Sequence, residues 1–171
     1  VKKICKGLEK NIAPLLEGCL VGPTIDPPPT AYNQRRRQYD ADLILNRLLH
    51  RIRGEHKVLG LTPYDLYTSS ADLNFVFGLA QCPGRGAIVA LHRLDPRFYR
   101  LRADEEVLTE RAVKETVHEL GHTFGLEHCT TPGCVMNFSN SIVDVDKKGS
   151  SFCRKCWRRL SKERVLIHIW K

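Results

Sequence analysis

The sequence predicts an α/β protein, in which a mixed twisted sheet carries two main helices and is followed by a small C-terminal lobe. Short runs of β-branched and bulky apolar residues alternate with two longer segments of helical periodicity. Four of the seven cysteines lie close together near the C-terminal end. A chain of 171 residues, 42% of them hydrophobic, can bury one continuous core. We therefore expect a single domain with a main α/β part and a smaller cysteine-bearing part.

The first main helix is predicted over residues 34–53, as a helix that backs the sheet. It follows the three prolines at residues 27–29, through which no helix or central strand continues. Asp40 and Asp42 lie near its start, where acidic side chains favour the positive end of the helix dipole. We interpret the run Arg35-Arg36-Arg37 as its solvated first turn, with a nucleic-acid contact as the less favoured alternative. The apolar positions with helical spacing are Ala41, Ile44, Leu45, Leu48, Leu49 and Ile52.

Three short strands are predicted over residues 58–61, 73–79 and 87–91. Each run is rich in β-branched or bulky apolar residues and is bounded by glycine, proline or polar residues. Between the last two runs, Pro83, Gly84 and Gly86 predict a turn.

The second main helix is predicted over residues 104–124. Three acidic residues stand at its start, and Val113, Val117, Leu120 and Phe124 form an apolar stripe along it. Beyond Gly125 the chain is basic and rich in cysteine, with a last helix predicted over residues 154–162. We therefore divide the domain into an upper α/β subdomain, residues 1–125, and a small C-terminal subdomain, residues 126–171.

The charge of the chain is concentrated at one end. The formal net charge is +8, and the segment from Lys147 to Lys171 holds nine basic residues and one acidic residue, Glu163. The rest of the chain is therefore neutral. A basic segment on a neutral body indicates either a nucleic-acid contact or compensation for something anionic in the same segment.

Nothing in the sequence predicts a membrane-spanning or exported protein. No stretch approaches the roughly 20 apolar residues of a membrane helix, and the first residues do not resemble a secretory signal. We therefore expect a cytoplasmic protein whose cysteines are reduced. Clustered cysteines in such a chain favour a metal site over disulfides. Three cysteines lie outside the cluster, and we interpret them as small, at least partly buried residues without a function: Cys5, Cys19 and Cys82.

The segment from His118 to His128 reads HELGHTFGLEH, which matches the pattern H-E-x-x-H-x-x-G-x-x-H in full. On a helix, His118 and His122 lie on one face, one turn apart, where two imidazoles can bind one zinc ion. Gly125 predicts the turn that ends the helix and returns His128 to the same metal. Three neutral nitrogen ligands leave one coordination position open, as in hydrolytic zinc sites. Glu119, rotated by about 100° from His118, is placed to take a proton from a zinc-bound water rather than to act as a ligand.

Four cysteines and one methionine follow this motif directly. Cys129, Cys134, Cys153 and Cys156 have spacings that suit a tetrahedral structural zinc. Met136 is the single methionine of the chain and lies eight residues beyond His128. Zinc enzymes with the extended histidine motif, the metzincins, carry a methionine turn beneath the metal, and we assign this turn to Met136. It would support the histidines without binding the metal.

The pattern from His118 to Cys156 resembles the archaemetzincin family of zinc metallopeptidases. The resemblance extends to Arg36-Arg37-Gln38-Tyr39, Arg93-Leu94, residues 73–78 and residues 138–141. It implies a zinc-dependent metallopeptidase with two zinc ions per chain, one catalytic and one structural. Carried over by position, the catalytic ligands are His118, His122 and His128, the general base is Glu119, and the structural ligands are Cys129, Cys134, Cys153 and Cys156. The sequence departs from other metzincins in having no tyrosine after Tyr99, so no tyrosine of the methionine turn can stabilise an oxyanion.

Peptide or protein substrates are therefore the favoured partners, although two alternatives stay open. The basic C-terminal lobe could make the chain a nucleic-acid-binding zinc module, or the fold could bind peptides and cleave them weakly. Arg154, Lys155, Arg158 and Arg159 surround the last cysteine pair, and we favour the view that they offset the negative charge of a zinc bound by four thiolates. The sequence predicts no membrane partner and does not determine the oligomeric state.

Overall fold

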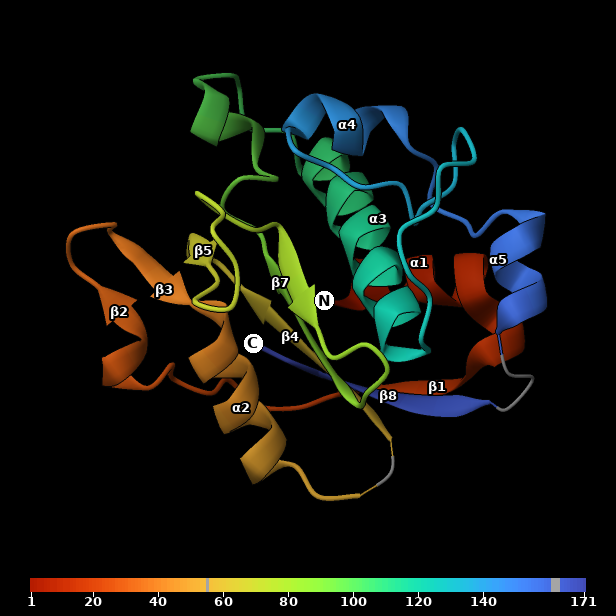
Figure 1. Ribbon diagram of the computed structural model, residues 1–171, viewed down its shortest axis with the longest axis horizontal. Coiled ribbons are helices and arrows are strands. Elements are labelled where there is room, and N and C mark those ends of the chain that lie inside the picture. Colours follow the sequence, from red (N-terminus) through yellow and green to blue (C-terminus); the bar gives the residue numbers. More distant parts are fainter. Residues whose placement is uncertain (55, 161–163) are drawn as a thin grey trace.

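The computed structural model describes residues 1–54, 56–160 and 164–171 and shows a five-stranded sheet with helices on both faces (Figure 1). The four strands β1, β8, β4 and β7 run parallel, and β6 at the edge runs antiparallel to β7. The mixed sheet predicted from the sequence is thus confirmed. In spatial order the strands are β1 (Leu16–Val21), β8 (Val165–Trp170), β4 (Lys57–Thr62), β7 (Gly86–Ala90) and β6 (Gly78–Ala80).

Alternate residues of the central strands face different helices. On β7, Ala87 and Val89 join the core under α3 (Glu105–Thr123) and α1 (Lys2–Ile12), whereas Ile88 and Ala90 pack with α2 (Ala41–Arg51). A strand that is buried on both faces requires apolar residues at every position, which explains its continuous apolar run. The two main helices therefore lie on opposite faces of the sheet.

The second main helix has the predicted bounds to within one residue, but the first is shorter than predicted. Asp104 accepts hydrogen bonds from the amides of Glu106 and Val107 and so begins α3. Asp40 caps α2 in the same way, and α2 therefore begins at Ala41 rather than at residue 34. The interpretation of residues 35–37 as a helical turn is wrong, because they belong to the turn between β2 (Tyr32–Asn33) and β3 (Gln38–Asp40).

Two of the three predicted strands match β4 and β7 closely, and the third does not. Of the predicted strand over residues 73–79, only Gly78 and Leu79 belong to β6. The preceding residues are irregular, and Val76 makes an isolated bridge to Leu66 of β5 (Leu66–Tyr67). Strand β6 packs against α3, and the irregular segment leads into β6 from β5. The strand prediction failed there because the apolar side chains of this segment line the wall of a cleft, described below, instead of packing inside the sheet.

The structure also contains elements that the sequence prediction did not include. Helix α1, strand β1 and strand β8 were not predicted, and β8 joins the main sheet although its residues were placed with the C-terminal subdomain. The last predicted helix corresponds to α5 (Arg154–Arg159), and residues 161–162 of that prediction lie outside the described residues. In the described ranges, no helix is both long and apolar enough to cross a membrane. The remaining short helices are η1 (Ala13–Leu15), η2 (Pro29–Ala31), η3 (Pro96–Tyr99) and α4 (Ile142–Lys147).

Candidate active site and metal centres

The three histidines of the motif come together at the C-terminal end of α3. His118 and His122 lie one turn apart on this helix, with their Nε2 atoms 3.1 Å from each other. Gly125 has a φ of +85°, a left-handed conformation that favours glycine, and it reverses the chain after the helix. His128 then returns, so that one ring nitrogen from each histidine lies within 4.8 Å of the others. The structure therefore assembles the three side chains that the sequence singled out.

Backbone carbonyls fix the orientation of the two helical histidines. His118 Nδ1 donates a hydrogen bond to Val135 O at 2.8 Å, and His122 Nδ1 donates to Leu126 O at 2.7 Å. Because a carbonyl only accepts, the Nδ1 atoms carry the protons and the Nε2 lone pairs face each other. Burial is the largest cause that lowers the pKa of both imidazoles, which keeps them neutral. Two converging lone pairs beside a third imidazole are a donor set that fits a zinc ion.

Glu119 lies beside this cluster, buried between α3 and the edge strand β6. A Cβ atom added to Gly78 would lie 2.6 Å from Glu119 Cγ and from Oε1, so glycine at this position leaves room for the carboxylate. Burial raises the pKa of Glu119 well above its ordinary value, the neighbouring Glu115 raises it further, and Lys148 opposes both. Glu119 therefore binds a proton more tightly than a solvent-exposed glutamate does.

A cleft of about 450 Å³ contains the three histidines and Glu119. One wall is formed by β6 and by the irregular segment over residues 68–77, and the other by residues 138–140. The exposed ring of Phe138 lies edge-on to His128, with 4.8 Å between ring centroids. The cleft is thus open to solvent, with His118 and Glu119 buried, His122 partly buried and His128 exposed.

Arg36 and Gln38, from the turn at β3, anchor the wall formed by the irregular segment. Arg36 Nη2 donates to Leu73 O at 2.8 Å and to Asn74 O at 3.0 Å, and its guanidinium stacks on Tyr67. Gln38 Nε2 also donates to Asn74 O, at 3.0 Å. Arg36 and residues 73–78 both belong to the family resemblance, but their pairing depends on the topology of two distant segments and is not readable from the sequence.

We expect Arg36→Met to weaken substrate binding more than catalysis. Loss of the guanidinium leaves Leu73 O without its donor and Asn74 O with the bond from Gln38 alone. KM should therefore rise about 2- to 13-fold, corresponding to about 0.5–1.5 kcal/mol for one net hydrogen bond. The change in kcat should stay below the change in KM, because Arg36 does not contact the histidines. Steady-state kinetics on one peptide would measure both. Arg35→Met, at an exposed neighbouring arginine, is the control; equal effects of the two variants would contradict the role of Arg36.

Met136 is fully buried and packs against Gly121, inside the histidine motif. Any side chain at Gly121 would collide with Met136 Sδ and with the ring of Phe152, so glycine on α3 creates the space that the thioether fills. The backbone carbonyl of Met136 accepts a hydrogen bond from the amide of Cys129 at 2.9 Å. Met136 therefore lies between α3 and the segment that carries His128.

Behind the histidines lies a buried ion pair that the sequence analysis did not identify. Lys148 Nζ is 2.8 Å from Glu115 Oε1, and the two side chains are 1% and 3% exposed. The same ammonium lies 3.4 Å from His118 Nδ1 and from Asn137 O. Lys148 belongs to the basic C-terminal segment, where lysines are expected to face solvent. Its burial shows that part of the basic charge compensates an internal carboxylate.

We expect Lys148→Met to lower the free energy of unfolding by about 3–5 kcal/mol, because it leaves Glu115 buried without a partner. Urea unfolding of the zinc-loaded protein at neutral pH would measure the loss. The adjacent Lys147 is exposed, so Lys147→Met provides a matched control with the same change of charge. A loss no larger than that of Lys147→Met would show that the buried pair contributes no net stability.

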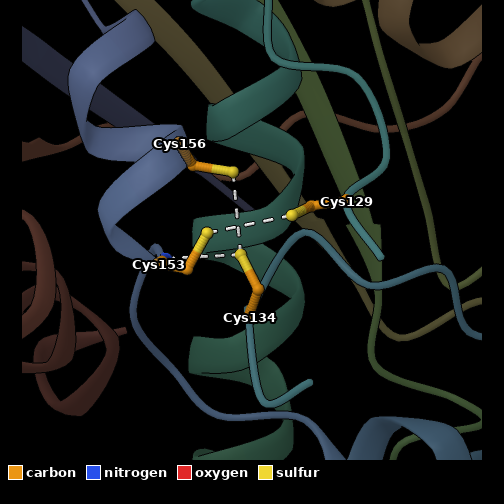
Figure 2. A group of neighbouring side chains, drawn as sticks. All are labelled: Cys129, Cys134, Cys153 and Cys156. Carbon is orange, nitrogen blue, oxygen red and sulfur yellow. Dashed lines mark hydrogen bonds between the residues drawn. The ribbon is translucent and has the colours of Figure 1, made fainter. Parts of the chain in front are cut away.

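The four clustered cysteines point toward one another from two segments of the C-terminal lobe (Figure 2). Cys129 and Cys134 come from the chain after α3, and Cys153 and Cys156 come from the start of α5 (Arg154–Arg159). The Sγ–Sγ distance is 3.8 Å for Cys129–Cys153 and 3.7 Å for Cys134–Cys156. All four sulfur atoms lie within 4.8 Å of one another. This is the arrangement of a closed, four-thiolate metal site.

The protonation of these thiols differs with their surroundings. Burial raises the pKa of Cys134 and Cys156. Burial also acts to raise the pKa of Cys153, but hydrogen bonds outweigh it, the largest from the Cys156 backbone, and lower it to about 6. Two buried thiols that resist ionisation need a cation at the centre to become thiolates. The basic side chains of α5 are exposed around this centre: Arg154, Lys155, Arg158 and Arg159.

Comparisons with known proteins agree with this site. The model of peptidase family M54 matches residues 3–162. An archaemetzincin from Methanocaldococcus jannaschii is 44% identical, over 98% of this chain and 90% of its own length. One from Pyrococcus furiosus is 51% identical, over 77% of this chain and 69% of its own length. The crystal structure of an archaemetzincin from Archaeoglobus fulgidus, in complex with malonate, has a TM-score of 0.75 at 39% identity and covers 94% of each chain.

These matches extend far beyond the histidine motif. The family model includes the four cysteines as well as both main helices. A second archaemetzincin structure, from Methanopyrus kandleri, has a TM-score of 0.68 at 49% identity, over 77% of this chain and 71% of its own. The chain therefore belongs to peptidase family M54, the archaemetzincins, and is a zinc-dependent metallopeptidase.

Proposed function

We propose that the chain hydrolyses peptide bonds in peptide or protein substrates, with Glu119 as general base and with His118, His122 and His128 as the ligands of the catalytic zinc. The observation that carries this proposal is the convergence of three imidazole nitrogens beside a buried carboxylate in one open cleft. When bound, zinc supplies a Lewis acid that polarises the substrate carbonyl and acidifies water.

The residues of the chain have separate tasks in this proposal. Val135 O and Leu126 O hold the Nδ1 protons of His118 and His122, so that both rings keep one orientation through the reaction. Glu119 accepts a proton from the attacking water on its carboxylate and then donates it to the nitrogen of the leaving amine. A raised pKa suits the first step, because a carboxylate with a higher proton affinity takes the proton of the attacking water more readily, while a carboxylic acid is still acidic enough to pass that proton to an amine.

We further propose that the four cysteines bind a structural zinc, and that Met136 is the methionine turn. The closed sulfur cluster supports the first assignment, and the contact between Met136 and Gly121 supports the second. The division into residues 1–125 and 126–171 and a cytoplasmic location remain predictions from the sequence. The exposed basic residues of α5 surround the proposed thiolate site, which supports an electrostatic role for them.

We expect two zinc ions per chain. Atomic emission of the purified, dialysed protein would count them, and His118→Ala should retain one, because its substitution leaves all four cysteines in place. The same measurement on Cys134→Ser tests the structural site separately. A native content of one ion would contradict either the histidine or the cysteine assignment.

Hydrolysis itself is tested with a panel of internally quenched peptides. Cleavage should stop when a chelator removes zinc and return when zinc is added back in slight excess. A chain that binds these peptides with two zinc ions in place but does not cleave them would overturn the catalytic proposal in favour of the weakly active, peptide-binding alternative.

A further inference from the structure

Two cysteines outside the zinc cluster lie unusually close together. Cys5 is on α1 and Cys19 is on β1, and their Sγ atoms are 2.6 Å apart. In the four-cysteine cluster, the two close pairs are at 3.7 and 3.8 Å. Both thiols of the Cys5–Cys19 pair are half-buried, so small molecules in solvent can reach them. The expectation that these two cysteines have no function rested on their separation in sequence, which the fold removes.

The sequence around each cysteine explains why the two side chains meet. Ile4, Leu8 and Ile12 are buried along one face of α1 and fix the rotation of the helix over the sheet. Leu15, the last residue of η1, and Leu16, the first residue of β1, are also buried. Because the short η1 joins the helix to the strand, α1 folds back and places Cys5 beside Cys19. The approach of the two sulfurs therefore follows from packing of the surrounding apolar residues.

We propose that Cys5 and Cys19 are a redox-sensitive pair that closes into a disulfide between α1 and β1. The oxidant is a low-molecular-weight disulfide such as oxidised glutathione. Cys5, after losing its proton to solvent, attacks one sulfur of the oxidant, and one glutathione leaves as thiolate. Cys19 then loses its proton and attacks Cys5 Sγ of the mixed disulfide, and the second glutathione leaves. Two protein thiols are oxidised and one oxidised glutathione is reduced to two thiols, so atoms and electrons balance.

The order of attack follows from the surroundings of the two thiols. Burial raises the pKa of Cys19, and the hydrogen bond with Cys5 raises it further, so Cys19 is protonated at neutral pH. A protonated thiol is a poor first nucleophile. Once Cys5 carries the mixed disulfide, Cys19 is adjacent to its target, and the high local concentration compensates for a small fraction of thiolate.

The disulfide would strengthen the contact of α1 with the catalytic part of the molecule. Gly7 of α1 packs directly against Val113 of α3, where any side chain at Gly7 would collide. Asn11 Oδ1 accepts hydrogen bonds from Ser150 Oγ at 2.8 Å and from Ser151 Oγ at 2.9 Å. Ser151 O in turn accepts the amide of Val135, whose carbonyl orients His118. Fixing α1 to β1 therefore stabilises a helix that supports both α3 and the cysteine lobe.

The experiment uses the full, zinc-loaded chain in buffers of reduced and oxidised glutathione. Peptide mapping without reduction should show a peptide pair joined through Cys5 and Cys19 in the oxidised wild type and in Cys82→Ser. Cys5→Ser and Cys19→Ser should lack it. The Tm of the oxidised wild type should exceed that of the reduced form by about 5–10 °C, as expected for a closed loop of this length. Cys5→Ser and Cys19→Ser should have the same Tm in the oxidised and the reduced buffer.

Two results would overturn the proposal. The first is that both thiols remain open to alkylation in a buffer that fully oxidises a reference dithiol. The second is that the oxidised wild type contains the Cys5–Cys19 bridge but has an unchanged Tm, which would remove its stabilising role. Zinc content measured in parallel shows whether the four-cysteine cluster has stayed intact. Because neither thiol belongs to a proposed metal site, these outcomes are independent of the proposed hydrolysis.

Discussion

Glu119→Gln is expected to reduce peptide hydrolysis by about 10²- to 10⁴-fold, the usual contribution of a general acid–base group. Glutamine has nearly the same volume, so it fills the space that Gly78 leaves beside α3. It cannot accept the proton of the attacking water. The side chain is not a proposed ligand, so both zinc ions and the Tm should stay close to the values of the native protein. Glu119→Ala should lose hydrolysis to the same extent, with a small cavity in addition.

The comparison that makes this test decisive is with Glu127→Gln. Glu127 belongs to the same motif and stands directly before His128, but its side chain is 80% exposed and lies 3.9 Å from Arg159. Its substitution changes the charge by the same amount and should leave kcat within about twofold, because surface ion pairs contribute at most about 1 kcal/mol. Retained turnover in Glu119→Gln, with zinc content unchanged, would remove Glu119 from the mechanism. Equal losses in both variants would point to a general effect of charge.

The parts of the fold that the sequence predicted well are those governed by local signals. Helix α3 has an acidic cap at Asp104 and an apolar stripe, and both are readable within twenty residues. The histidine motif lies on this one helix and the turn after it, so its geometry follows from helical spacing. The cysteine cluster spans two segments but carries spacings typical of metal sites. These features required no knowledge of the topology.

The features that the sequence did not reveal depend on contacts between distant segments. Lys148 looked like one of many basic residues near the C-terminal end, and only the fold brings it to Glu115. Strand β8 is a nearly continuous apolar run interrupted only by His168, and it directly follows a basic segment that indicates an exposed surface rather than a sheet. The start of α2 was misplaced because arginines are good helix formers, whereas the Asp40 cap sets the true boundary.

The second large effect is expected from Cys156→Ser, which should weaken the catalytic zinc although Cys156 is far from the histidines in sequence. Two paths connect the sites. Cys129 is bonded directly to His128, and its amide donates to Met136 O at 2.9 Å. Cys134 is bonded to Val135, whose carbonyl accepts the Nδ1 proton of His118 at 2.8 Å. A zinc ion bound by the four cysteines, as proposed, would therefore fix the chain on both sides of the histidine site.

Removing one thiolate opens this arrangement, because Cys156 is buried and its sulfur lies 3.7 Å from that of Cys134. The zinc concentration for half-maximal hydrolysis should rise about 10- to 100-fold, the usual cost of losing the support of a metal ligand. Stability should fall as well, because a structural zinc contributes folding free energy directly. Metal-buffered activity assays and thermal unfolding of the same preparations would measure both effects.

Two variants separate this coupling from simpler explanations. Cys5→Ser also removes a half-buried thiol, but outside the cluster, and should leave the zinc concentration for half-maximal hydrolysis unchanged. Glu119→Gln should lose hydrolysis while keeping its zinc and its Tm, the opposite combination to Cys156→Ser, which should keep its kcat at saturating zinc. If Cys156→Ser retained a tightly bound catalytic zinc and the native Tm, the cysteine centre would be an independent appendage. The orientation of His118 and His128 would then depend on α3 and the turn at Gly125 alone.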